Sequence, residues 1–196
     1  ENSTVKEGEV MTSNGESKLT DDIKALIGVE GEEHEVTVWG VEKEGLRRFT
    51  QAVMDPDPRH YDEKFAKSTK FGETTTPGIY VTYLNRTHPR EDDPVTRAFR
   101  ENPVSDGIGG VRTSSRPGAL PDIPTDLVRV LNAGNEIEVY KYPSMGDRVF
   151  AKNKYHNITE RVGRDGSHML IITMETTYRN QDGTLLCITR SSSFRR

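Results

Sequence analysis

The segment from Asp55 to His60 constrains this chain more than any other stretch. Its two prolines, Pro56 and Pro58, lack N–H donors and keep the residues before them out of the helical region of backbone space. A helix that precedes the segment must therefore end near Asp55, and the chain must turn. The turn places a carboxylate, Asp55, and an imidazole, His60, five residues apart. Both groups are common proton donors and acceptors in catalysis.

A second constraint follows closely along the chain. Phe71 and Gly72 mark a turn, and Pro77 and Gly78 then open an apolar run that is typical of a helix. An acid, a base and a backbone N–H at a helix start are the parts needed to add water to an activated carbonyl compound, or to remove it.

Each of these residues also has a simpler interpretation. Asp55 can serve only to end the preceding helix and cap the turn, and His60 can be a surface histidine beside Tyr61. Gly78 can be a glycine that close packing requires. The residues alone leave these alternatives open.

Composition narrows the class of partner. No stretch of the 196 residues approaches the ~20 apolar residues of a membrane-spanning helix. The net charge is −4, whereas proteins that bind nucleic acids usually carry a basic face. We therefore expect no membrane and no nucleic acid as partners. The single cysteine, Cys187, excludes an intrachain disulfide and favours a cytoplasmic location. Its apolar neighbours indicate a buried strand residue rather than a nucleophile.

One folded domain is expected over residues 23–196. Residues 1–22 are polar and typical of a disordered tail, in which Met11 or an earlier residue is the native start. Hydrophobic residues make up only 32% of the chain, which agrees with a tail and long loops. Between residues 87 and 126, six prolines interrupt a polar stretch, which predicts a long loop inserted in the domain.

Helices are predicted in the first half of the chain and strands in the second. The apolar spacing indicates helices over residues 23–27, 42–54 and 77–84, a helical turn over 62–66 with Asp62 as its N-cap, and a strand over 35–39. Alternating patterns and hairpin signals predict four further strands, over residues 135–142, 148–158, 169–178 and 185–194. An antiparallel meander of these four strands gives an α+β fold class.

With these elements in order, the sequence resembles the MaoC-like (R)-specific enoyl-CoA hydratase and dehydratase family. The family motif reads D-x-N-P-x-H-x-D, followed by an alanine, F-G and a glycine that opens the central helix. The matching residues here are Asp55, Pro58, His60, Asp62, Ala66, Phe71, Gly72 and Gly78. Residues 132–136, 146–147 and 178–183 also resemble the N-terminal half-domain of two-part MaoC dehydratases, so the resemblance covers about residues 23–196.

Two positions depart from the family pattern. Asp57 stands where the family has asparagine, and it places a second carboxylate near Asp55. Arg59 stands where the family usually has an apolar residue, and its charge can neutralise Asp57. The N-terminal half-domains often lose the histidine and serve as substrate-binding partners, whereas this chain keeps His60.

The resemblance implies a hot-dog fold, in which an antiparallel sheet wraps around a central helix. It also implies reversible hydration of a 2-enoyl thioester, usually of coenzyme A, to a 3-hydroxyacyl thioester. Asp55 and His60 would then hold the water, and the Gly78 N–H would stabilise the thioester oxygen. Gly72 and Pro77 would complete the substrate-binding positions. Neither a metal nor a redox cofactor is expected, and coenzyme A enters only as part of the substrate.

Three functions are therefore compared. The first is a hydro-lyase acting on an acyl thioester, and the second is a non-catalytic acyl-binding subunit that completes the site of a partner. The third is a lyase that uses the same acid–base pair on a small molecule that is not a thioester. Because an exposed sheet edge requires a cover, we expect a homodimer, or a heterodimer with a second hot-dog subunit.

Overall fold

The main element of the structure is an antiparallel sheet of five strands. The structure is a computed structural model, and it describes residues 16–84, 94–104 and 117–196. The strands lie in the order β1-β3-β4-β5-β2. Their bounds are β1 His34–Glu35, β2 Val130–Val139, β3 Val149–Val162, β4 His168–Asn180 and β5 Leu185–Arg195. The three longest strands are consecutive, so hairpins join them, as the Asp182-Gly183 signal predicts.

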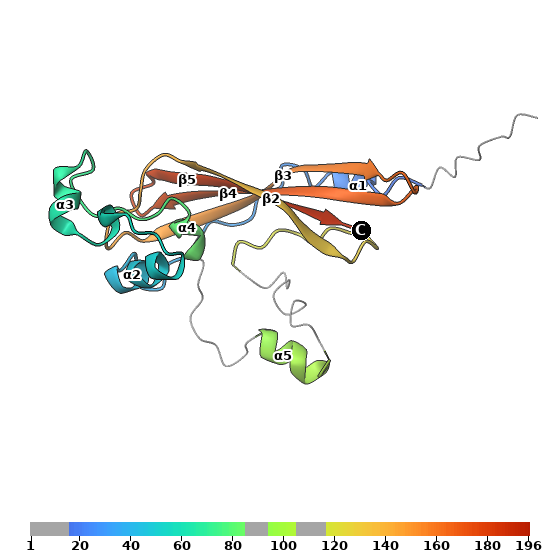
Figure 1. Cartoon of the computed structure of the whole chain (residues 1–196). Coiled ribbons are helices and arrows are strands. Elements are labelled where there is room, and N and C mark those ends of the chain that lie inside the picture. Colours follow the sequence, from blue (N-terminus) through green and yellow to red (C-terminus); the bar gives the residue numbers. More distant parts are fainter. Residues whose placement is uncertain (1–15, 85–93, 105–116) are drawn as a thin grey trace, which may run out of the picture.

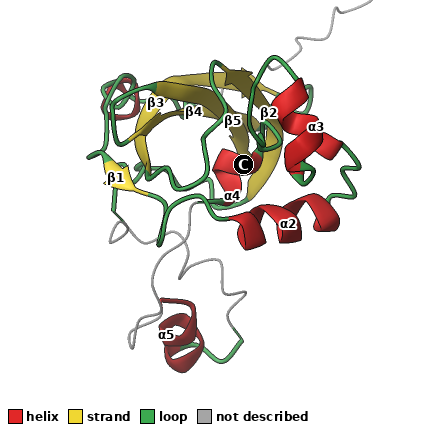
Figure 2. Ribbon diagram, turned by 90° about the vertical axis from the view of Figure 1, so that its left-hand side faces the viewer, coloured by secondary structure: helices red, strands yellow, loops and turns green. Residues whose placement is uncertain are grey.

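Short helices lie at the two ends of this sheet, and one, α5, lies apart from it (Figures 1 and 2). The helices are α1 Asp21–Lys24, α2 Lys43–Ala52, α3 Glu63–Ser68, α4 Tyr80–Tyr83 and α5 Pro94–Glu101, with a 3-10 turn η1 over Pro58–His60. Figure 1 shows α2, α3 and α4 at one end of the sheet and α1 at the other. Seen along the sheet, the strands curve around α4 (Figure 2). This is the α+β hot-dog arrangement that the sequence predicts.

The position of β2 corrects the expected meander. Residues 135–142 were expected to pair with the next strand, but β2 begins at Val130, ends at Val139 and pairs with β5. After β2, the N–H groups of Tyr140 and Lys141 both donate to the Leu186 carbonyl, and the chain then crosses the end of the sheet to reach β3 on its far side. The connection is long enough for this crossing, and the alternation of side chains does not specify which edge a strand joins.

Two further elements are shorter than expected. Strand β1 ends at Glu35 rather than near residue 39, because the Val149 N–H turns from the backbone ladder to the Thr37 hydroxyl, at 3.2 Å. Helix α4 begins at Tyr80 rather than at Pro77, whose carbonyl accepts the Tyr80 N–H at 2.9 Å in the turn before the helix. The helices over residues 42–54 and 62–66 are confirmed as α2 and α3.

The packed part of the chain begins before residue 23, the expected boundary. Ser17 and the backbone N–H of Lys18 both donate to the Glu160 carboxylate, at 2.6 and 2.7 Å. Part of the expected loop at residues 87–126 is also structured: α5 lies within it, apart from the sheet (Figures 1 and 2). Its last residues pack on the sheet, where the Pro121 carbonyl accepts a hydrogen bond from the Tyr155 hydroxyl at 2.8 Å.

The core divides into two clusters along the sheet. The first joins α2 and α4 to β3, β4 and β5, and its members include Val41, Leu46, Tyr80, Val81, Val149, Tyr178 and Leu186. The second joins α1 and the segment before β2 to the other half of the sheet, through Ile23, Ile123, Tyr155, Ile158, Leu170 and Ile172. The first cluster therefore supports the end of the sheet that carries the Asp55–His60 turn.

Truncation of Val149 tests this assignment. The side chain is fully buried in the first cluster (0% exposed), so we expect Val149→Ala to lower the free energy of unfolding by about 2 kcal/mol or more. Val162→Ala is the matched control, since Val162 lies on the same strand but is 58% exposed, and we expect a change within about 0.5 kcal/mol. Equal losses in urea denaturation of the two variants would contradict the assignment.

Candidate active site

Helix α2 delivers Asp55 to the site through a specific helix end. The helix presents Leu46 and Thr50 to the core and ends at Ala52. Met54 then adopts φ 55°, its N–H donates to the Gln51 carbonyl at 3.2 Å, and the Asp55 N–H donates to the Thr50 carbonyl at 2.9 Å. These two hydrogen bonds around a left-handed residue form a Schellman motif. Asp55 is its last residue, so its backbone is fixed to the end of α2.

The proline-containing turn continues from this point. The Asp55 carboxylate accepts the Asp57 N–H at 3.1 Å, and Asp57 in turn caps η1 by accepting the Arg59 N–H at 2.9 Å. The Arg59 guanidinium also binds the Asp57 carboxylate, with its Nε at 2.7 Å, and this contact holds the pKa of Asp57 at about 2. Arg59 therefore neutralises Asp57, as expected, and leaves Asp55 as the carboxylate that faces His60.

His60 is held by the backbone of Thr75. Its Nδ1 lies 2.6 Å from the Thr75 carbonyl oxygen, and the Thr75 N–H donates to the carbonyl of Arg59 at 3.1 Å. Because a carbonyl only accepts hydrogen bonds, Nδ1 must carry the proton. In the neutral ring Nε2 is therefore unprotonated and is the atom that exchanges protons. The imidazole is buried, with a side chain only 4% exposed, so it does not point to solvent beside Tyr61.

The structure brings Asp55 and His60 together. Asp55 Oδ2 lies 3.4 Å from His60 Nε2, and the Asp55 side chain is 32% exposed. The separation is too long for a strong direct hydrogen bond. A water molecule lying beside the two atoms can donate to the Asp55 carboxylate; it donates to Nε2 when that nitrogen is unprotonated and accepts from it when it carries a proton. One partner is thus fixed in the protein and the other reaches solvent, which suits an exchange of protons with a bound molecule.

The other expected site residues lie in different places. Gly78 is in the turn before α4, three residues after the Thr75 carbonyl that binds His60. A Cβ at Gly78 would lie 3.0 Å from Val139 Cγ2, so a larger residue there would have to displace the Val139 side chain of β2 slightly. No described residue accepts its N–H. Pro77 is half-buried in the same turn, whereas Gly72, with φ 73°, is exposed in the turn after α3.

Three residues near the pair were not predicted from the sequence. Met54 and Thr75 act through their backbones, so their side chains carried no signal. Thr76 is fully buried, and its hydroxyl has no hydrogen-bond partner among the described residues. The one sequence signal that connects Thr76 with the Asp55–Gly78 family motif is its place two residues before Gly78.

The remaining chemistry-bearing groups lie elsewhere. Among residues 16–84, 94–104 and 117–196, no three His, Cys, Asp or Glu side chains are grouped to hold a metal ion. Cys187 is buried in the first core cluster, as predicted, and its burial raises the pKa of the thiol to about 12. None of the helices that the structure describes combines the length and the apolar character needed to cross a membrane.

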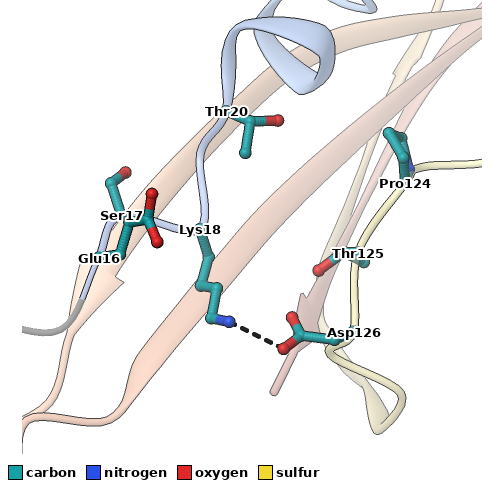
Figure 3. Close-up of a pocket in the computed structure, with 7 residues that line it drawn as sticks. All are labelled: Glu16, Ser17, Lys18, Thr20, Pro124, Thr125 and Asp126. Atoms are coloured by element: carbon teal, nitrogen blue, oxygen red, sulfur yellow. Dashed lines mark hydrogen bonds and ion pairs between the residues drawn. The ribbon is translucent and has the colours of Figure 1, made fainter.

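A separate pocket of about 230 Å³ lies at the opposite end of the sheet, near α1. Its lining is mostly polar and consists of Glu16, Ser17, Lys18, Thr20, Pro124, Thr125 and Asp126. Lys18 and Asp126 pair across it at 2.8 Å (Figure 3). Neither Asp55 nor His60 lines this pocket, so it does not belong to the acid–base site.

A curved sheet around a short helix is the hot-dog arrangement (Figure 2), and a carboxylate and an imidazole lie together at one end of it. A family model described as "FAS1-like, dehydratase domain region" matches residues 25–189. The chain belongs to this family, and its MaoC-like character is confirmed. No curated protein sequence matches the chain significantly.

Solved structures agree on the fold. The ChsH1-ChsH2 complex from Mycobacterium tuberculosis contains a chain with a TM-score of 0.61 and 12% identity, over 89% of this chain and 86% of that one. A chain of the HadBC (3R)-hydroxyacyl-ACP dehydratase complex from the same organism has a TM-score of 0.53 and 18% identity, over 86% of this chain and 96% of that one. A MaoC-like dehydratase from Rhodospirillum rubrum has a TM-score of 0.51 and 20% identity, over 87% of this chain and 93% of that one.

The unpaired hydroxyl of Thr76 leads to a prediction. A buried hydroxyl without a partner costs about 1–3 kcal/mol, and valine has the same shape, so we expect Thr76→Val to raise the free energy of unfolding by about 1 kcal/mol. Thr50→Val is the matched control, because the buried Thr50 hydroxyl donates to the Leu46 carbonyl at 3.1 Å, and its loss should leave stability unchanged or lower it. A destabilised Thr76→Val protein would show that the hydroxyl has a partner.

Proposed function

We propose that this chain is a hydro-lyase that reversibly hydrates a 2-enoyl thioester, with Asp55 and His60 as its acid–base pair. The observation that carries the proposal is the 3.4 Å separation of Asp55 Oδ2 and His60 Nε2, with Nδ1 committed to the Thr75 carbonyl. Membership of the dehydratase family supports the same reaction class.

The reaction begins with His60 protonated on Nε2 as well as on Nδ1, and with an ionised Asp55. Asp55 takes a proton from water as the water oxygen bonds to C3 of the enoyl group, and the electron pair of the double bond moves toward the thioester carbonyl. Nε2 then delivers its proton to C2, which gives the 3-hydroxyacyl thioester. A proton transfer from Asp55 to Nε2 restores the starting state. Positioned proton transfer of this kind typically accelerates a reaction by ~10²–10⁴-fold.

The thioester oxygen gains negative charge during this step and needs a donor. We assign this role to the Gly78 N–H, because it has no acceptor among the described residues and lies in the segment that Thr75 attaches to His60. The acid–base steps use only this chain's residues and water, so coenzyme A is proposed only as a carrier of the substrate. Gly72 is left out of the substrate site because it lies in an exposed turn.

Hydration of crotonyl-CoA and of a longer 2-enoyl-CoA, followed by loss of the enoyl absorbance, tests the proposal. We expect activity in the wild-type protein and a loss of roughly 10²-fold or more in both His60→Ala and Asp55→Asn. His168→Ala is the control, since His168 pairs with Glu160 outside the site, and its activity should be unchanged. Full activity in His60→Ala would contradict the proposal. Inactive, folded wild-type protein would favour a substrate that is not a thioester, or a missing partner subunit.

The edge of the sheet supports a two-unit assembly. On its outer side β2 pairs with no strand among the described residues, and it carries exposed Leu131, Ile137 and Val139 at 47%, 39% and 39%. A long, partly apolar edge strand of this kind is normally covered. Because Val139 contacts the Gly78 turn, a unit placed on β2 would adjoin the site. The similar chains from the ChsH1-ChsH2 and HadBC structures come from complexes. We therefore propose a dimer, with itself or with a second hot-dog subunit.

Light scattering coupled to size-exclusion chromatography measures this assembly. We expect a mass of about two chains for the purified protein, and a shift toward the monomer when a charge is placed on the edge in Ile137→Lys. Val162→Lys, at a strand residue that is 58% exposed and outside β2, should leave the mass unchanged. A stable wild-type monomer that is fully active alone would contradict both forms of dimer.

A further inference from the structure

Met54 has a backbone conformation that is unusual for its residue type. It is the one residue other than glycine with a positive φ, 55°, in the described part of the chain. The left-handed region disfavours residues with a Cβ, and glycine adopts it freely. The conformation must therefore be maintained by contacts around Met54.

The Met54 side chain does not supply those contacts. It is 86% exposed, so it buries little apolar surface that could offset the strain. The backbone hydrogen bonds of the Schellman motif do: Met54 to Gln51 at 3.2 Å and Asp55 to Thr50 at 2.9 Å. The strain is thus linked to the direction in which the chain leaves α2, rather than to packing of the side chain.

That direction places the carboxylate. Asp55 follows Met54 immediately, its Oδ1 accepts the Asp57 N–H at 3.1 Å, and its Oδ2 lies 3.4 Å from His60 Nε2. A change of φ at Met54 would rotate the whole Asp55–Asp57 turn relative to α2. His60 would move less, since the Thr75 carbonyl holds it independently.

We propose that the left-handed turn at Met54 is a positioning element that directs Asp55 toward His60. The effect on turnover rests on the proposed function, whereas the effect on structure does not. The competing explanation is that the exposed Met54 side chain itself contacts a substrate or a partner. The two explanations order substitutions differently, by left-handed propensity in the first case and by apolar size in the second.

A series of substitutions at position 54 separates them. Met54→Gly removes the strain, and we expect its melting temperature to rise by about 2–4 °C with kcat retained. Met54→Asn tolerates the left-handed region and should resemble the wild-type protein. Met54→Ile strongly disfavours it, and we expect a lower melting temperature and a fall in kcat of roughly 10–100-fold with a smaller change in KM. Met54→Ala is an intermediate case that should fold even if Met54→Ile does not.

Val53 provides the matched control, because it precedes Met54, has an ordinary φ of −90° and is 49% exposed. There the order should reverse, so that Val53→Gly is less stable than Val53→Ile. The ¹⁵N shifts of the His60 imidazole are a readout that needs no turnover. They should change in Met54→Ile as they do in Asp55→Asn, and remain unchanged in Met54→Gly.

One result overturns the proposal: Met54→Gly and Met54→Asn have lower melting temperatures or altered His60 ¹⁵N shifts, while Met54→Ile has the wild-type values. That order would follow side-chain size. An equal response across the series also overturns it. If the wild-type protein hydrates no enoyl thioester, the melting temperatures and the His60 shifts still decide whether the turn positions Asp55. Failure of the proposed function and failure of this inference are therefore distinguishable.

Discussion

The rest of the site depends on the hydrogen bond from His60 Nδ1 to the Thr75 carbonyl, at 2.6 Å. It attaches the turn after α2 to the segment before α4, two parts of the chain that no strand pairing joins. It also buries the imidazole in one orientation and leaves Nε2 as the atom that faces Asp55. This carbonyl thus sets the tautomer and orientation of the imidazole, and the Thr75 N–H, which donates to the Arg59 carbonyl at 3.1 Å, joins the same two segments a second time.

The sequence predicted the parts of the site that depend on local rules. The two prolines predict that α2 ends near Asp55, Asp62 caps α3, and the spacing of Asp55 and His60 indicates a pair on one turn. The Thr75 contact could not be predicted, because a backbone carbonyl leaves no mark in the sequence. The left-handed turn at Met54 was missed for a related reason: a methionine gives no glycine signal.

The fold was predicted at the level of class and strand content, but the strand order was not. Alternation in residues 135–142 indicates a strand with two faces, yet it does not say whether β3 or β5 is its neighbour. The choice of β5 has consequences for the site. It leaves β2 as an edge strand and places Val139 against the Gly78 turn. The edge at which we propose a second subunit therefore also borders the proposed oxyanion donor.

The most direct test of this account is a measurement of the protonation of the two ring nitrogens of His60. In a long-range ¹H–¹⁵N spectrum of the neutral ring, assigned by comparison with His60→Gln, we expect a protonated Nδ1 and an unprotonated Nε2. That result would show that the atom facing Asp55 is free to take up a proton and, once protonated, to deliver it to C2 of the substrate. A protonated Nε2 with a bare Nδ1 would contradict the contact with Thr75 and, with it, the proposed acid–base pair.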